Sequence, residues 1–425
     1  MERTIVMTQG WFDGERHRPE EVAMLIESGM IQRILRCDRE QLSTQLPDGW
    51  NDNVPVRDAA YVMPGLVEAH CHLLLDGGEL NFKRRSDYLK SDRDTMLAAG
   101  RNQLAANLNH GITLIRDAGD IHGINHQIRE EISNGNAVAP TLRSPGVALR
   151  KKGRYGSFMA REVADSQSIA ATVEEIAETA DDLKIVLTGI IDFEHGCVKG
   201  EPQFDREELG LIVDSAKRCG RSTFAHCSGE AGLNLAVEVG VDSIEHGFFM
   251  TEKILRKMAN KNIAWVPTFS PVHFQWAQPE LAGWNVETVG HLARILDRHR
   301  TMLELASRLG VPLIAGSDAG SYGVKHGSAL LDEIVFMHEA GIPLELVLHG
   351  ATSLPRKTWN CQNADIAEGN KADLLLLNGS PFDDPANLRE LLAVYKDGWF
   401  EPENQNVEAG KDTITSEAVK YSKAC

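Results

Sequence analysis

Short apolar runs rich in β-branched residues recur between about residues 62 and 320, and this pattern predicts β-strands. Eight such runs can be counted: Val62–His72, Gly111–Gly119, Thr141–Leu149, Leu183–Gly189, Ser222–Cys227, Ser243–Gly247, Ile263–Phe269 and Pro312–Gly320. Stretches with a helical repeat of apolar residues lie between most of them. Strands that alternate with helices imply right-handed βαβ units and a parallel sheet. Eight such strands predict an α/β fold with a closed (β/α)8 barrel of the TIM type.

The clearest helical stretch covers residues 205–219. Its apolar side chains follow the i, i+3, i+4, i+7 spacing of one helix face: Leu209, Ile212, Val213 and Ala216. Asp205 and Glu208 have the spacing of a capping box, in which each side chain accepts a free backbone N–H of the first turn. Gly220 is typical of a helix C-terminus.

An open doubly wound sheet is the competing architecture. Such a sheet would carry a nucleotide-binding loop, but we find neither G-x-G-x-x-G after a strand nor a Walker loop. The pattern therefore favours the barrel over the open sheet.

The two ends of the chain have a different pattern from the middle. Residues 1–60 and 366–400 contain short extended runs that are broken by glycines. Chain termini are often neighbours in space, so we expect both ends to join in one small module. The predicted domains are a composite β-sandwich module of residues 1–60 and 366–425 and a barrel of residues 61–365.

Charge and cysteine content exclude several classes of function. The chain has 44 Lys and Arg against 61 Asp and Glu, a net charge of −17, which argues against binding to a phosphate backbone. Its seven cysteines are scattered and contain no C-x-x-C, so neither a disulfide framework nor a thiolate zinc site is indicated. No apolar run has the length of a signal h-region or a membrane span. We expect a cytoplasmic homo-oligomer with a small-molecule substrate, no nucleic acid and no membrane.

Polar residues that could bind a metal stand at the ends of the predicted strands. His70 and His72 end the first run, and because side chains alternate along a strand, both imidazoles point the same way and can bind one metal ion. His226, His246 and Asp318 end the fifth, sixth and eighth runs. In a (β/α)8 barrel these ends converge on one mouth, where active sites are built.

The ordered set of motifs resembles the amidohydrolase superfamily. It comprises Pro64-Gly65-Leu66 before His70-x-His72, Arg116-Asp117-Ala118-Gly119, Lys184-Ile185, His226, Ile244-Glu245-His246-Gly247, Val266-Pro267-Thr268 and Gly316-Ser317-Asp318-Ala319-Gly320. Within the superfamily, the chain is most similar to the branch of imidazolonepropionase-like proteins and metal-dependent Xaa-Pro and Xaa-Arg dipeptidases. The resemblance covers nearly the whole chain, including the closing strands near Ala372 and Lys396.

The resemblance implies a site with two divalent metal ions. One ion would be held by His70, His72 and Asp318, and the other by His226 and His246. Lys184 would bridge them as a carbamate formed with carbon dioxide, which replaces an ammonium by an anionic group. Imidazole and carboxylate ligands suit zinc, although manganese or cobalt also fit such a site.

A site of this kind predicts hydrolysis of an amide or related C–N bond in a small molecule. Two metal ions about 3.5–4 Å apart activate water and polarise a carbonyl. Asp318 would be the catalytic residue, which takes a proton from the attacking water and delivers it to the leaving nitrogen. The expected substrate is a peptidyl or N-acyl amino acid or a cyclic amide.

Substrate contacts are expected from the loops at the mouth. The dipeptidase branch carries Gly-Gly-His after the third strand, whereas this chain has a basic run, Arg150-Lys151-Lys152-Gly153-Arg154-Tyr155. Arg154 and Tyr155 could bind an anionic group there, although a solvated basic turn is an equal alternative. Tyr322 and His326 are further candidates, because they follow Asp318 closely.

Several alternatives remain open. A deaminase of the same superfamily would need Glu three residues after His226, where this chain has Gly229, with Glu230 one position later. A carbamate or urea hydrolase and a metal-free scaffold are the other readings. His122 and His126 have the spacing of a zinc-protease helix, but Gly123 replaces the catalytic Glu, so we expect both to be solvated.

Overall fold

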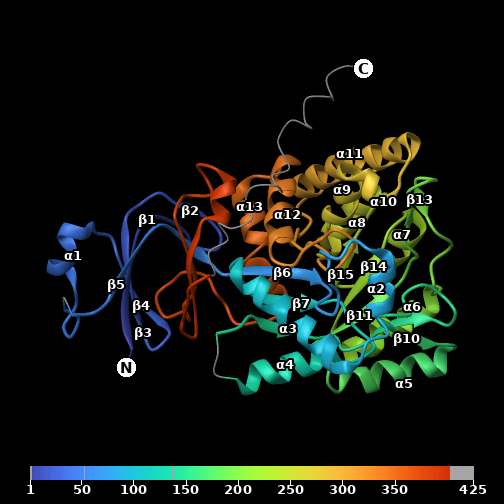
Figure 1. Cartoon of the computed structure of the whole chain (residues 1–425), viewed down its shortest axis with the longest axis horizontal. Helices are drawn as coiled ribbons and strands as arrows, with labels where there is room; N and C mark the ends of the chain where they lie inside the picture. The colour runs from blue at the N-terminus through green and yellow to red at the C-terminus, as the bar shows by residue number, and fades with distance from the viewer. Residues whose placement is uncertain (1, 52, 136–137, 403–425) are drawn as a thin grey trace.

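The computed structural model describes residues 2–51, 53–135 and 138–402. Segments from both ends of the chain pair into one eight-stranded sheet, at the left of Figure 1. Its strands are β1 (Arg3–Phe12), β2 (His17–Arg18), β3 (Val22–Glu27), β4 (Met30–Leu35), β5 (Val56–Pro64), β17 (Asp373–Leu377), β18 (Leu391–Lys396) and β19 (Trp399–Phe400). The order is β19-β18-β17-β5-β1-β3-β4, and β2 pairs with β1.

This terminal sheet joins the two ends of the chain directly. β5 from the N-terminal segment pairs with β17 from the C-terminal segment, in register from Tyr61–Leu377 to Pro64–Leu374. The predicted domain boundary at residue 60 therefore falls inside β5, and residues 403–425 of the predicted module lie outside the described residues. A helix, α1 (Arg39–Gln45), and a 3-10 turn, η1 (Pro385–Arg389), complete these segments.

The middle of the chain forms parallel strands. One sheet contains β6 (Leu66–Cys71), β7 (Ile112–Asp117) and β8 (Thr141–Arg143). The other contains β9 (Ala148–Lys151), β10 (Ala160–Val163), β11 (Asp182–Val186), β14 (Ser222–Cys227), β15 (Ser243–His246) and β16 (Ala264–Val266), in the order β10-β9-β11-β14-β15-β16. Single bridges from Trp265 to Leu313 and from Cys71 to Ala319 attach the segment 312–319 to both sheets. This α/β arrangement is consistent with a TIM barrel.

Three of the predicted strands differ from the structure. The run Val62–His72 is divided at Gly65, because β5 ends in the terminal sheet and β6 begins in the parallel one. The run Thr141–Leu149 forms two short strands, β8 and β9, rather than one. The run Pro312–Gly320 is not a regular strand: it makes two single bridges, although its backbone also exchanges hydrogen bonds with Trp265, Ala69 and His70.

Helices surround the parallel strands in Figure 1. The larger ones are α3 (Arg93–Asn109), α4 (Ile124–Asn134), α5 (Ser166–Ala177), α6 (Arg206–Arg218), α7 (Glu230–Val239), α8 (Glu252–Lys261), α11 (Val286–Leu309) and α12 (Ser328–Glu339). Shorter ones are α2 (Phe82–Tyr88), α9 (Ser270–Ala277), α10 (Pro279–Ala282), α13 (Leu344–Gly350) and α14 (Ser353–Thr358), and a two-stranded hairpin pairs β12 (Ile191–Asp192) with β13 (Cys197–Val198).

The helix predicted over residues 205–219 is confirmed as α6. Asp205 Oδ1 accepts the Glu208 N–H at 2.9 Å, and Glu208 Oε2 accepts the Asp205 N–H at 3.2 Å, so the capping box is complete. Its predicted apolar face is buried. Within residues 2–51, 53–135 and 138–402, none of the helices combines the length and the apolar character needed to traverse a bilayer.

Candidate metal centre

Three predicted ligands meet at the end of β6. The Nε2 atoms of His70 and His72 lie 3.6 and 3.4 Å from Asp318 Oδ1. Ligand atoms of all three residues lie within 4.8 Å of one another, and the side chains are buried. The Asp318 N–H donates to the His70 carbonyl at 2.7 Å, which fixes the loop of Asp318 against the strand of the histidines.

These spacings suit a shared cation better than hydrogen bonds. Nitrogen-to-oxygen distances of 3.4 Å and more are long for hydrogen bonds, and Asp318 Oδ1 is buried without such a partner among the described residues. Ligands about 2.1 Å from a tetrahedral zinc ion lie about 3.4 Å from one another. The donor set at the end of β6 therefore fits a divalent metal.

The remaining predicted ligands come from neighbouring strands. Lys184 Nζ, from the middle of β11, lies 3.4 Å from His70 Nε2. His226 and His246 end β14 and β15, and their ring centres are 4.5 Å apart. The ring of His246 is also 4.9 Å from that of His70, so the three histidines form a continuous group. All six predicted ligands line one cavity of about 210 Å³.

Burial favours the uncharged forms of His70, His226 and Lys184 in this cavity. Desolvation, with a contribution from Lys184, lowers the pKa of His70 to about 4 and that of His226 to about 3. These two imidazoles are therefore neutral at pH 7, with lone pairs free for a metal. Desolvation also lowers the pKa of Lys184 to about 8. A fraction of this amine is thus uncharged near neutral pH, which is the form that can react with carbon dioxide.

A buried carboxylate orients the first histidine. Glu245 Oε2 accepts from His70 Nδ1 at 2.6 Å, which directs Nε2 of His70 into the cavity. Glu245 Oε1 accepts from Arg116 Nη2 at 2.9 Å and from Ser243 Oγ at 2.7 Å. Burial alone would raise the pKa of Glu245, but Arg116 and His70 lower it to about 2, so the group is anionic.

Hydrogen bonds from two further buried side chains hold the ends of the strands that carry the predicted ligands. Glu68 Oε1 accepts the N–H groups of His70 and Ser317 at 3.0 and 2.9 Å. Thr268 Oγ1 lies 2.8 Å from His246 Nδ1. Our sequence reasoning missed the roles of Glu68 and Glu245. Both could have been found from the sequence, because each is an acidic residue within an apolar strand and lies one or two positions before a predicted ligand.

The predicted substrate residues do not all reach the cavity. Tyr155 and Tyr322 line it. His326 is buried elsewhere, with Nε2 3.0 Å from the Leu75 carbonyl. Arg154 is exposed and donates to the Glu201 carbonyl, because the loop after β9 turns its side chain away. Arg85, from a loop-borne helix that the sequence analysis did not consider, lines the cavity instead.

The basic run after the third predicted strand is partly neutralised. Arg150 Nη2 pairs with Glu162 at 2.6 Å, and Lys151 pairs with Glu208. Two of the four cations in this run are therefore paired with carboxylates of the protein.

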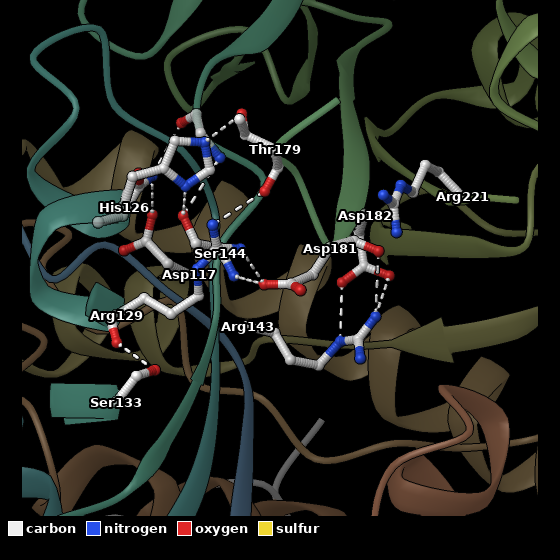
Figure 2. A network of polar contacts seen from close by, with 12 residues as sticks. Asp117, His126, Arg129, Ser133, Arg143, Ser144, Thr179, Asp181, Asp182 and Arg221 are labelled. Atoms are coloured by element: carbon white, nitrogen blue, oxygen red, sulfur yellow. Dashed lines mark hydrogen bonds and ion pairs between the residues drawn. The ribbon is translucent and has the colours of Figure 1, made fainter. Parts of the chain in front are cut away.

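The expectation that His126 is solvated is wrong. Figure 2 shows His126 between two hydroxyl groups, with Nδ1 2.6 Å from Ser144 Oγ and Nε2 3.2 Å from Thr179 Oγ1. The side chain fastens α4 to β8 and to the turn before β11. Glu230, the residue weighed for deamination, is exposed at the start of α7 and does not line the cavity.

Comparisons with known proteins find hydrolases that are similar to this chain. The ochratoxinase of Aspergillus niger is 28% identical over 367 residues, which cover 78% of this chain and 73% of that protein. The imidazolonepropionase of Rhodococcus jostii is 23% identical over 244 residues, 50% of this chain and 55% of that one. A solved Xaa-Pro dipeptidase with bound methionine in its active site superposes with a TM-score of 0.79 at 24% identity, covering 94% of this chain and 100% of that one, and this likeness shows the fold.

The model of the amidohydrolase family matches residues 61–411, which is most of the chain. The resemblance inferred from the ordered motifs is thereby confirmed. The protein therefore belongs to the amidohydrolase family and is a hydrolase that acts on C–N bonds.

Proposed function

We propose that this protein is a metal-dependent amidohydrolase that cleaves the amide bond of a peptidyl or N-acyl amino acid, or of a cyclic amide. The observation that carries the proposal is the convergence of His70, His72 and Asp318, with their ligand atoms within 4.8 Å, on a cavity that Lys184, His226 and His246 also line. The similarity to ochratoxinase and to a Xaa-Pro dipeptidase supports an amide substrate.

The donor set supports two divalent ions, with zinc as the first choice. His70, His72 and Asp318 would hold one ion and His226 and His246 the other, with carbamylated Lys184 between them. Buried nitrogen and oxygen atoms without hydrogen-bond partners among the described residues, His246 Nε2 and Asp318 Oδ1, fit this assignment. When bound, the metal pair supplies an activated water and polarises the scissile carbonyl.

The protein's own residues would handle the proton. Asp318 Oδ2 accepts from Ser321 Oγ at 2.9 Å, so this bond leaves Oδ1 directed toward the histidines. In the proposed reaction Asp318 takes a proton from the attacking water and passes it to the leaving nitrogen, as the C–N bond breaks. Tyr155 lines the cavity with its ring 5.7 Å from that of His226, and we propose that its hydroxyl contacts the substrate.

The proposed function requires that the strand ends surround one cavity. We propose that the parallel strands close into an eight-stranded barrel through the segment 312–319, whose bridges to Trp265 and Cys71 support it. The terminal sheet would form a small β-sandwich module, since apolar clusters lie on both of its faces.

Metal content and catalytic turnover test the proposed function together. Zinc-loaded protein should contain two equivalents of metal by elemental analysis and hydrolyse at least one class in a panel of dipeptides, N-acyl amino acids, cyclic amides and carbamates. Chelation should abolish turnover, and zinc should restore it. Asp318→Asn should reduce kcat by about 10²–10⁴-fold, because it removes the proton carrier.

Asp192→Asn is the matched control for Asp318→Asn, since Asp192 is a half-buried aspartate of the β12–β13 hairpin that does not line the cavity. It should leave kcat unchanged. Metal-loaded protein that turns over none of the four classes would contradict the proposal. Protein that binds no stoichiometric metal would favour a scaffold, and ammonia released from an aminated ring would favour a deaminase.

A further inference from the structure

Arg85 brings a positive charge to the metal cavity from outside the predicted ligand set. It belongs to α2, which follows the loop after β6. Among the described residues that line the cavity, Arg85 and Lys184 are the cationic ones. Lys184 lies at the base of the cavity beside His70, so Arg85 is the cation available to a bound substrate beyond the metal ligands.

Backbone carbonyls hold this guanidinium in place. Nη1 donates to the carbonyls of Asp76 and Glu79, and Nη2 donates to that of Gly320 at 2.8 Å. Gly320 lies two positions after Asp318, so the group is fixed close to the predicted catalytic carboxylate. The Nε proton and the second Nη2 proton have no acceptor within residues 2–51, 53–135 and 138–402. Two such donors suit a carboxylate.

No carboxylate of the described residues lies within 4 Å of the Arg85 guanidinium, although the charges of Asp76 and Glu79 act on it from farther away. Both carboxylates instead accept backbone N–H groups of the turn: Asp76 accepts the Gly78 N–H, and Glu79 accepts the Asn81 N–H, each at 2.8 Å. Arg150 and Lys151 in the basic run, in contrast, each pair with a glutamate. A half-buried guanidinium with free N–H donors and no carboxylate in contact favours an anionic ligand at Arg85.

The same helix carries an aromatic surface beside the charge. Phe82, three positions before Arg85 and so on the same face of α2, is 61% exposed. Its ring stacks on that of Tyr322, with ring centres 4.5 Å apart, and Tyr322 lines the cavity. Leu281, whose carbonyl accepts the Tyr322 hydroxyl, is also exposed. The mouth thus combines one cation with an apolar wall.

We propose that Arg85 binds a carboxylate of the substrate, and that Phe82 and Tyr322 contact an apolar group next to it. This inference rests on the proposed function and narrows it to amino acids with an aromatic or large aliphatic side chain, acylated at their nitrogen. It moves anion recognition from Arg154, where the sequence analysis expected it, to Arg85.

A matched pair of substrates tests the proposal. N-acetyl-L-phenylalanine and N-acetylphenethylamine carry the same scissile amide, but the second lacks the carboxylate. Wild-type protein should prefer the acid. Arg85→Gln should raise KM for the acid by about tenfold to a hundredfold, the effect of losing hydrogen bonds to a charged group, with a smaller change in kcat. Turnover of the phenethylamine should stay the same.

Arg84→Gln is the control, because Arg84 is exposed on the same helix and pairs with Glu79 outside the cavity. It should leave both substrates unaffected. If Arg85→Gln reduces kcat/KM equally for both substrates, Arg85 only holds the loop in place, and the proposal is overturned. The proposal is also overturned if kcat/KM falls for neither substrate.

Calorimetric binding separates this proposal from the function on which it rests. If zinc-loaded wild-type protein turns over neither compound, the proposed function is contradicted for this class. N-acetyl-L-phenylalanine should still bind wild-type protein at least tenfold more tightly than Arg85→Gln. Equal binding by the two proteins would overturn the role of Arg85 independently of catalysis.

Discussion

Glu245 connects a predicted metal ligand to a buried guanidinium. Its two carboxylate oxygens are divided between His70 on one side and Arg116 with Ser243 on the other. The Arg116 guanidinium also lies 4.2 Å from the centre of the Phe224 ring, so its position is fixed by both charge and packing. Such carboxylate–histidine pairs set the tautomer and orientation of a ligating imidazole.

Glu245→Gln should therefore weaken metal binding by about 10–100-fold, because the amide orients His70 less well than the carboxylate does. Competition with a chromophoric chelator measures the loss. Ser243→Ala removes one hydrogen bond to the same carboxylate without touching His70, and it should change the affinity little. Unaltered affinity in Glu245→Gln would mean that His70 is oriented by its packing alone.

At the residue scale, the sequence predicts the metal ligands better than it predicts the residues that orient them or that line the cavity beside them. His70, His72, His226, His246 and Asp318 could be located because strand ends converge in a parallel fold. Arg85 could not, since its approach to the cavity depends on hydrogen bonds to the carbonyls of three loop residues. Loop conformations of this kind have no periodic signal.

At the scale of elements, turns after the strands aim the ligands. His246, Thr268 and Asp318 have positive φ angles of 67°, 50° and 57°. Residues other than glycine rarely adopt this conformation, and it is common at functional sites. Apolar periodicity could predict the strands, but these single left-handed residues decide where each strand ends. The run Pro312–Gly320 could be recognised from its apolar residues, although it forms two single bridges rather than a continuous ladder.

The capping box of α6 gives a prediction confined to one element. Asp205→Ala should lower the free energy of unfolding by about 1 kcal/mol, because the Glu208 N–H loses its acceptor at the helix start. Chemical denaturation measures the change, and kcat and KM should not move, since α6 does not line the cavity. Asp214→Ala, at an exposed position of the same helix, should cost much less. Equal costs for the two variants would show that the cap is dispensable.

At the scale of the whole molecule, the terminal sheet and the parallel strands meet at Gly65. A Cβ atom there would lie 2.1 Å from both Asp373 Oδ1 and Thr113 Oγ1, so no larger residue fits between β5 and β6. The sequence could predict that both chain ends form one module, but not that a single glycine divides a continuous apolar run between two sheets. That division depends on contacts with residues 113 and 373, which lie far away along the chain.

A buried ion pair spans the same junction and gives the last prediction. Arg356 Nη2 lies 3.1 Å from Asp373 Oδ2 and donates to Thr113 Oγ1 at 2.8 Å, and both charged side chains are buried. Arg356→Met should destabilise the protein by about 3–5 kcal/mol, because it leaves the Asp373 carboxylate buried without its partner. Denaturant unfolding followed by tryptophan fluorescence measures this loss.

The double variant separates charge from packing at this junction. Adding Asp373→Asn to Arg356→Met removes the stranded charge, so the double variant should regain a large part of the lost stability. If both variants are equally unstable, the loss comes from packing and from the hydrogen bond to Thr113. If Arg356→Met is as stable as wild type, the two sheets do not depend on this pair for their association, and the close approach at Gly65 must suffice.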